Sequence, residues 1–333
     1  MIFQPAIIAL LLSSAICVLA LALIAPFAFE VIRRWDIKSG SERQLQLERR
    51  TYLFSMLLAF VLVAQLASVL LFVFNAEKMS GMFVGAMCAV GTLNVNPYGF
   101  PALNAKIALF FLAAMWLAIN HVDSRARDYP LVRIKYALLL LLAPLLAVAA
   151  WTEAQFFVNL QADVITSCCG SLFSEGSKTL VAEASALEPV PAMLLFYGAM
   201  GLAIGMSSFH WAYGRGGYGV AVAAALGFAA GISGILSFIS LYIYEHPHHH
   251  CPFCVLKPEY GYQGYALYLP LFVATAAGLA AGAIRPFAGV ASLTAIVPDV
   301  SRRLASIASI GFLLTAAVAT AMILRSNLVL LDH

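Results

Sequence analysis

Long apolar stretches separated by short polar segments run the length of this 333-residue chain. A helix that crosses the hydrocarbon core of a bilayer needs roughly 20 consecutive apolar residues. The alternating pattern of a transmembrane β-strand is absent, and a spanning segment must satisfy its own backbone groups, so the pattern predicts helices. We predict eight of them, over residues 5–31, 52–75, 104–121, 136–158, 190–212, 218–244, 265–284 and 305–325.

Composition agrees with this interpretation, because 62% of the residues are hydrophobic and only 11% are charged. We therefore predict an all-α polytopic membrane helix bundle, with residues 1–333 forming a single transmembrane domain and no soluble domain. The lipid bilayer is the first expected partner. The stretch 5–31 has no basic residue before it and is too long for the apolar region of a secretory signal, so we expect it to remain as a spanning helix.

The distribution of lysine and arginine between the helices predicts the orientation, since short cytoplasmic loops are enriched in both. The loops after the first, third, fifth and seventh helices hold 14 of the 19 basic residues. These loops should be cytoplasmic and both termini outside, in a multi-pass protein of a cell inner membrane. The net charge of +3 then reflects topology, and we expect no nucleic-acid partner. The 14 residues are Arg33, Arg34, Lys38, Arg43, Arg49, Arg50, Arg125, Arg127, Arg133, Lys135, Arg215, Arg285, Arg302 and Arg303.

Five of the six cysteines fall in the three larger outer loops, which cover residues 76–103, 159–189 and 245–264. The outer side of an inner membrane is oxidising, so thiols there tend to be disulfides, metal ligands or redox catalysts. The loop cysteines are Cys88, Cys168, Cys169, Cys251 and Cys254.

The most concentrated chemistry lies in the nine residues His-Pro-His-His-His-Cys-Pro-Phe-Cys, numbered 246–254. A Cys-x-x-Cys turn places two sulfurs on one side of a tight loop, and thiolate with imidazole suits copper or zinc ions. We therefore expect a soft-metal site, most plausibly for copper, that serves binding, delivery or transport together with an extracytoplasmic metal- or thiol-handling protein or membrane complex. Its candidate ligands are Cys251, Cys254, His246, His248, His249, His250, Cys168 and Cys169.

Cys88 is a more distant candidate for the same site. Its loop also holds Met79, Met82 and Met87, whose sulfurs would suit transient contacts with Cu(I). Methionine and phenylalanine in such a loop are nevertheless more typical of a re-entrant or interfacial segment that packs on the bundle.

Two alternatives use the same cysteines. A membrane thiol-disulfide oxidoreductase would relay electrons between the pair Cys251/Cys254 and the pair Cys168/Cys169, with a quinone or a thioredoxin-like partner. A structural or assembly subunit would use them to staple the outer loops. Adjacent cysteines such as Cys168 and Cys169 need separate disulfide partners or one shared metal, because their Cα atoms lie about 3.8 Å apart and disulfides prefer roughly 4.4 to 6.8 Å.

The rest of the sequence does not indicate whether the protein is an enzyme. No Walker, Rossmann or Ser/His/Asp pattern stands out, so the chain shows no recognisable catalytic motif. Tyrosines after the Cys-x-x-Cys turn fit an aromatic belt at the membrane surface, or the wall of a quinone pocket. A haem between His121 and His210, or a metal path through Cys17, Met206 and His210, has little support in the pattern.

Overall fold

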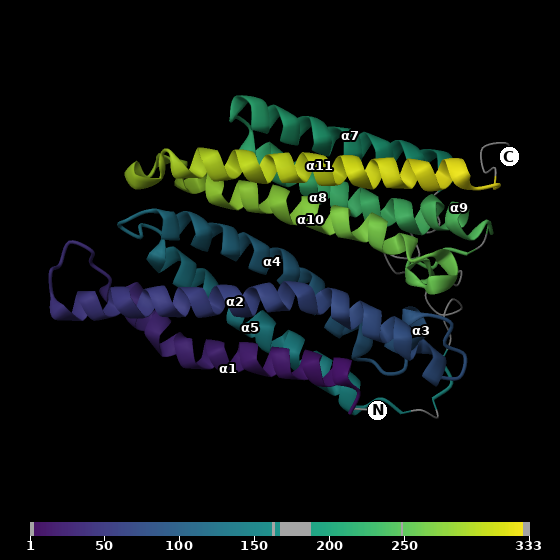
Figure 1. Ribbon diagram of the computed structural model, residues 1–333, viewed down its shortest axis with the longest axis horizontal. Coiled ribbons are helices and arrows are strands. Elements are labelled where there is room, and N and C mark those ends of the chain that lie inside the picture. The colour runs from purple at the N-terminus through teal and green to yellow at the C-terminus, as the bar shows by residue number, and fades with distance from the viewer. Residues whose placement is uncertain (1–2, 162–163, 167–187, 248, 329–333) are drawn as a thin grey trace. The chain divides into compact units, whose positions relative to one another are not determined.

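The computed structural model describes residues 3–161, 164–166, 188–247 and 249–328, and its helices follow the apolar pattern (Figure 1). Within these residues, eight helices are long and apolar enough to cross a membrane, which confirms the predicted all-α polytopic architecture. They are α1 (Pro5–Arg34), α2 (Glu42–Met79), α4 (Gly99–Arg125), α5 (Val132–Val158), α7 (Pro189–Tyr213), α8 (Gly217–Gly234) continued by α9 (Ser240–Tyr244), α10 (Gln263–Ile284) and α11 (Ile296–Arg325).

Two features go beyond the predicted helix boundaries. Helix α2 begins at Glu42, ten residues earlier than expected, so residues 42–50 of the charged segment between the first two helices form its first turns. Between α8 and α9, residues Ile235–Ile239 form one π-helical turn, designated η2. The shorter elements are η1 (Ser80–Met82), α3 (Ala89–Leu93), η3 (Cys254–Leu256), η4 (Pro258–Tyr260), η5 (Arg285–Gly289) and η6 (Ala291–Leu293).

The chain divides into two compact units. Unit 1 comprises residues 1–75, 96–160 and 283–300, and therefore holds α1, most of α2, α4 and α5. Unit 2 comprises residues 76–95, 161–282 and 301–333, and holds α3, α7 to α9, η3, η4 and most of α10 and α11. The expectation of a single transmembrane domain remains a prediction.

In unit 1, α1, α2, α4 and α5 pack side by side around one apolar core (Figure 1). Its largest fully buried rings are those of Trp116 and Tyr136. The hairpin between α4 and α5 is closed by a buried ion pair, Lys135 Nζ to Asp123 Oδ2 at 2.7 Å. Asp123 Oδ1 also accepts the amide hydrogen of Leu131 at 2.7 Å. The carboxylate thus holds the first turn of α5 to the last turn of α4.

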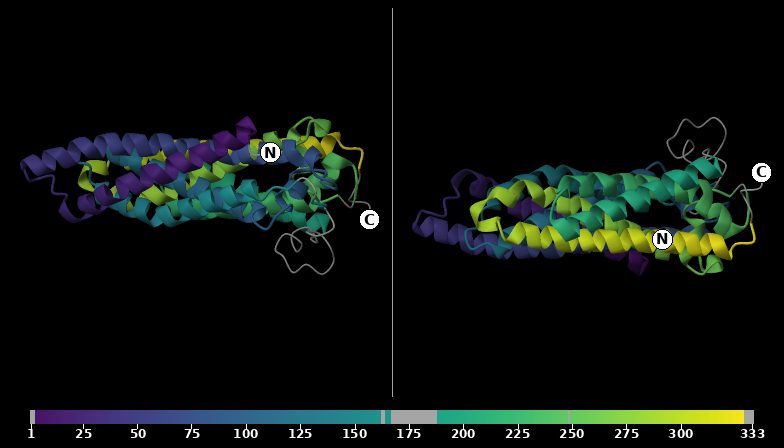
Figure 2. Two further views of the ribbon diagram at one scale, coloured as in Figure 1. Left: turned by 90° about the horizontal axis from the view of Figure 1, so that it is seen from below. Right: turned by 90° about the horizontal axis from the view of Figure 1, so that it is seen from above.

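In unit 2, α11 runs along α7, α8 and α10, as Figure 1 and the right view of Figure 2 show. Lipid offers little hydrophobic drive for helix association, so close packing at small residues carries much of it. A Cβ on Gly278 would lie 2.5 Å from the Cβ of Ala224, and one on Gly311 would lie 2.9 Å from the carbonyl of Pro270. These close approaches hold α8, α10 and α11 together below the loop that carries Cys251 and Cys254.

Candidate metal centre

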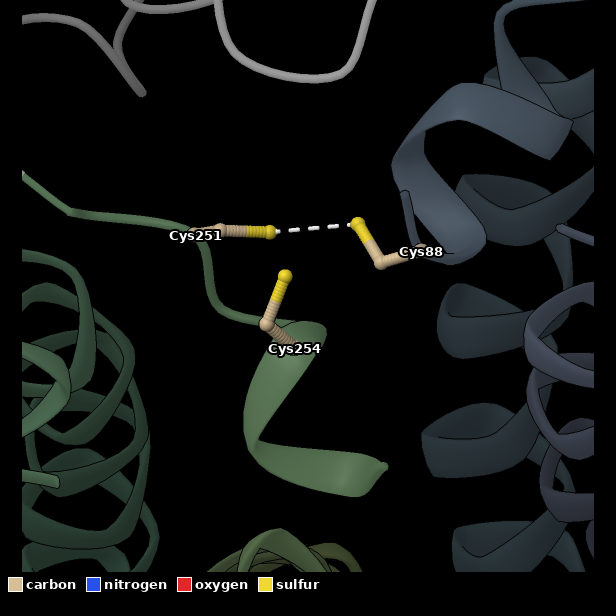
Figure 3. A group of neighbouring side chains, drawn as sticks. All are labelled: Cys88, Cys251 and Cys254. Carbon is tan, nitrogen blue, oxygen red and sulfur yellow. Dashed lines mark hydrogen bonds between the residues drawn. The ribbon is translucent and has the colours of Figure 1, made fainter. Parts of the chain in front are cut away.

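Three cysteine sulfurs meet in unit 2, and all three side chains point toward one another (Figure 3). Cys88 comes from the start of α3, Cys251 from the loop after α9, and Cys254 from the start of η3. All are buried, with Cys88 and Cys251 completely so. Residues 163 positions apart in the chain therefore contribute to one buried cluster of sulfur atoms.

The spacing of the sulfurs is near that of ligands of one metal ion. The three Sγ atoms lie within 4.8 Å of one another, and the Sγ atoms of Cys88 and Cys251 are 3.4 Å apart. Thiolates that bind one ion with bonds of about 2.3 Å lie roughly 3.8 to 4 Å from each other. A single ion between the three sulfurs thus requires only small adjustments of the side chains.

Cys88 is held in place by the first turn of α3. It occupies the N-cap position, with an extended backbone. The amide hydrogen of Ala89, one of those at a helix start that have no partner within the helix, goes to Oε2 of Glu77 at 2.7 Å. Glu77 is itself buried near the end of α2. The carboxylate therefore takes over the capping, and the Cys88 sulfur remains directed at the other two.

A second set of contacts fixes the chain just before Cys88. Thr166 donates its amide hydrogen to the carbonyl of Val84 at 3.0 Å and its hydroxyl to the carbonyl of Gly91 at 2.9 Å. Gly85 has a φ of +85°, and a Cβ there would lie 2.2 Å from the Thr166 carbonyl oxygen. Only glycine accommodates this crossing, which joins the loop 76–103 to the loop 159–189.

Two tyrosines hold the turn that carries the other sulfurs. Tyr244, at the end of α9, donates its hydroxyl to the carbonyl of Cys251 at 2.5 Å. Tyr268, in α10, donates its hydroxyl to the carbonyl of Pro252 at 2.8 Å. Cys254 then begins η3 and accepts the amide hydrogen of Lys257 at 3.0 Å. The backbone of the Cys-x-x-Cys turn is thereby anchored to both flanking helices.

His250 is directed into the protein by the π-helical turn. Its Nδ1 lies 2.9 Å from the carbonyl oxygen of Leu236, within η2. A carbonyl accepts only, so Nδ1 carries the hydrogen and Nε2 is left as the acceptor nitrogen. π-helical turns often occur at functional sites, and here the turn anchors the residue next to Cys251.

His249 interacts electrostatically with one of the three cysteines, Cys88. Burial lowers its pKa, and the charge of Cys88 partly opposes that effect. The imidazole is therefore neutral near pH 7, as a metal ligand must be. Its ring packs edge-on against Tyr244 at 4.3 Å between centroids, and its buried Nε2 has no hydrogen-bond partner among the described residues. His249 is not, however, part of the group of atoms within 4.8 Å of one another.

The remaining predicted ligands separate into two sets. His246 is described, and its side chain is exposed. His248, Cys168 and Cys169 lie outside the described residues, so both the disulfide relay and the staples that involve the adjacent pair remain predictions. Of the methionines in the loop 76–103, Met79 is buried, whereas Met82 and Met87 are exposed.

The other sequence-level candidates have local roles. His210 is buried, with Nδ1 2.9 Å from the carbonyl of Arg215 and Nε2 2.7 Å from the hydroxyl of Ser301. Both ring nitrogens are thus engaged in hydrogen bonds, which speaks against a haem or a metal path at this residue. Cys17 is buried in the core of unit 1. Tyr262 is exposed, as expected of an aromatic belt, while Tyr244 and Tyr268 serve the Cys-x-x-Cys turn instead.

The fold and this site define a multi-pass helical membrane protein with a buried cluster of three cysteines at metal-binding distance. Comparison with known proteins adds no family to that class: no protein-family model, no curated protein and no solved structure matches the chain. The case for function therefore depends on the chemistry of the cluster.

Proposed function

We propose that this protein binds a soft metal ion, Cu(I), through the thiolates of Cys88, Cys251 and Cys254, and handles copper at the outer face of the membrane. The observation that carries the proposal is the approach of three buried sulfurs to within 4.8 Å, from segments far apart in the chain. Buried thiols that merely fill space have no reason to converge, whereas thiolate ligands of one ion must do so.

The number of sulfurs favours copper over zinc. Structural zinc sites are almost always four-coordinate. Among the described residues, the group within 4.8 Å contains three ligand atoms, all of them sulfur. Cu(I) is a soft ion that thiolates select, and it accepts three ligands in a plane. A group of three sulfur ligands, as found among the described residues, suits Cu(I) better than the four-coordinate Zn(II).

Two histidines near the cluster could bind the copper ion as it enters or leaves. The Nε2 atom of His249 is buried close to the charge of Cys88 and has no hydrogen-bond partner in the described part of the chain. We assign it as a ligand that binds during transfer. His246 is exposed and only three residues away, so it would meet an ion arriving from solvent or from a delivery protein.

Competition with a Cu(I) chelator under reducing conditions tests the proposal. We expect the purified protein to bind one Cu(I) tightly and Cys88→Ser to bind it at least about 100-fold more weakly, because even residues behind the ligands change affinity 10- to 100-fold. Cys17→Ser is the matched control, since it removes a buried thiol from unit 1. Equal affinity of Cys88→Ser and Cys17→Ser would contradict the proposal.

One distance also favours a second candidate, thiol-disulfide exchange. The sulfurs of Cys88 and Cys251 are 3.4 Å apart, close enough to form a bond after a small movement. The two thiols would lose two electrons and two protons to a quinone or to the disulfide of a partner protein. This candidate predicts a disulfide between Cys88 and Cys251 that forms and breaks with such an acceptor, and that tightly bound Cu(I) would prevent.

A further inference from the structure

The helices of unit 1 enclose a buried ion pair that the metal site does not use. Lys106 Nζ on α4 lies 3.0 Å from Glu153 Oε1 on α5, and the two side chains are 2% and 0% exposed. The hydroxyl of Ser14 on α1 donates to Oε2 of the same carboxylate. Ionisable residues inside membrane helices are costly, and they commonly mark ion sites or proton relays.

The pair belongs to a hydrogen-bonded chain that crosses the bundle. Lys106 Nζ donates to Ser68 Oγ on α2 at 3.2 Å, and Ser68 lies 3.3 Å from Oε1 of Gln65. Gln65 Nε2 in turn lies 3.2 Å from the carbonyl of Ser13 on α1. The side chain of Ser13 is partly exposed, so the chain leads from the bundle surface to the buried carboxylate.

The second buried pair of unit 1 provides a contrast. Asp123 accepts a backbone amide hydrogen at one oxygen and Lys135 at the other, and thereby closes the α4–α5 hairpin. Glu153 is bonded only to side chains, Ser14 and Lys106. A serine hydroxyl can turn from donor to acceptor, whereas an amide only donates. Glu153 can therefore take up a proton if the Ser14 hydroxyl reorients. Protonation of Asp123 would instead weaken the bonds that close the α4–α5 hairpin.

We propose that Glu153, with Lys106, forms a proton-binding site inside the helices of unit 1. On protonation the carboxyl O–H donates to the Ser14 hydroxyl, which becomes its acceptor. Lys106 retains its contacts with the Ser68 hydroxyl and with the ring of Phe72, 5.6 Å from Nζ. Cys17 on α1 is a further titratable group whose charge interacts with Lys106.

The position of the site along the helices allows exchange with water. Glu153 is five residues before the end of α5 and Lys106 seven residues after the start of α4. At 1.5 Å per residue, these are depths of roughly 7 and 10 Å below the helix ends. A proton reaches the carboxylate without crossing the bilayer core.

Infrared spectroscopy of the full-length protein in lipid nanodiscs tests the site. Between about pH 6 and pH 9, exposed carboxyl groups remain ionised because their ordinary pKa lies near 4. We expect a C=O stretching band of a protonated carboxyl group that changes across this range. The spectra are recorded in a Glu77→Gln background, because Glu77 is a further buried carboxyl group. The band should be lost when Glu153→Gln is added and retained in Asp123→Asn, the matched control. In Lys106→Gln it should persist to the highest pH, because the carboxylate has lost its counter-ion.

Two results would overturn the inference. One is the absence, in the wild-type protein, of any carboxyl band that changes between about pH 6 and pH 9. This result does not depend on whether the variants fold. The other is a band that survives in Glu153→Gln. A purely structural ion pair predicts instead that Glu153→Gln lowers thermal stability as Asp123→Asn does, with no change in the infrared band. None of these outcomes depends on copper binding.

Discussion

At the residue scale, the sulfur cluster owes its geometry to groups that are not ligands. The hydroxyls of Tyr244 and Tyr268 hold the carbonyls of Cys251 and Pro252, and the carboxylate of Glu77 holds the amide of Ala89 beside Cys88. Such contacts orient metal ligands and tune their affinity. The positions of the three sulfurs are therefore maintained by hydrogen bonds to the backbone at or next to Cys88 and Cys251.

Tyr268→Phe tests this role with every ligand left in place. The variant removes one hydrogen bond to the Cys-x-x-Cys turn, so we expect Cu(I) affinity to fall by about 10-fold while one ion still binds. Chelator competition measures the change. Tyr262→Phe is the matched control, because Tyr262 is exposed. An affinity of Tyr268→Phe equal to that of the control would show that the hydroxyl does not position the site.

The residues also explain what sequence reasoning missed. The pair Cys251 and Cys254 could be recognised from its spacing, since a Cys-x-x-Cys turn converges locally. Cys88 could be named only as a more distant candidate, because Cys251 and Cys254 are 163 and 166 positions away and its own loop resembles an interfacial segment. Glu77 gave one usable signal, a carboxylate at the end of an apolar helix, but its partner is a backbone amide that no side-chain pattern reveals.

At the element scale, the short helix α3 and the loop before it position Cys88 within unit 2. The loop is held where Gly85 passes the carbonyl of Thr166. Apolar periodicity predicted the long helices well, since each must cover its backbone in lipid. It missed α3 and the π-helical turn η2, because five-residue elements are stabilised by contacts at either end and not by their own pattern.

Gly85→Ala tests the crossing. The new Cβ would lie 2.2 Å from the Thr166 carbonyl oxygen at a backbone conformation that disfavours alanine, so we expect a loss of about 1 to 3 kcal/mol in stability. Thermal unfolding in detergent measures it. Gly81→Ala is the control, because a Cβ there has nothing within 4 Å. If both variants unfold at the wild-type temperature, the crossing does not constrain the loop.

At the scale of the whole molecule, the proposed function requires the cysteine cluster to face the outer side of the membrane. The bias of lysine and arginine predicts that the cysteine loops face outward and that the segment between α1 and α2 faces the cytoplasm. Two of the residues in that bias have other roles, since Lys135 is buried against Asp123 and Arg133 donates to the carbonyl of Trp35. The bias persists without them, in the remaining arginines and lysines of the same loops.

Labelling of single added cysteines in intact cells tests the orientation. Cys251 is fully buried and a poor target, whereas Tyr262 and Lys38 are exposed on opposite predicted sides. We expect a membrane-impermeant thiol reagent to label Tyr262→Cys in intact cells and Lys38→Cys only after lysis. The reverse pattern would place the cysteine cluster on the cytoplasmic side, where thiols are kept reduced.

The most direct measurement of the central claim is X-ray absorption spectroscopy at the copper edge of the protein loaded with one Cu(I). The account predicts a three-coordinate Cu(I) whose neighbours are all sulfur, and the loss of one sulfur in Cys88→Ser. A spectrum dominated by nitrogen or oxygen neighbours, or one unchanged in Cys88→Ser, would contradict it.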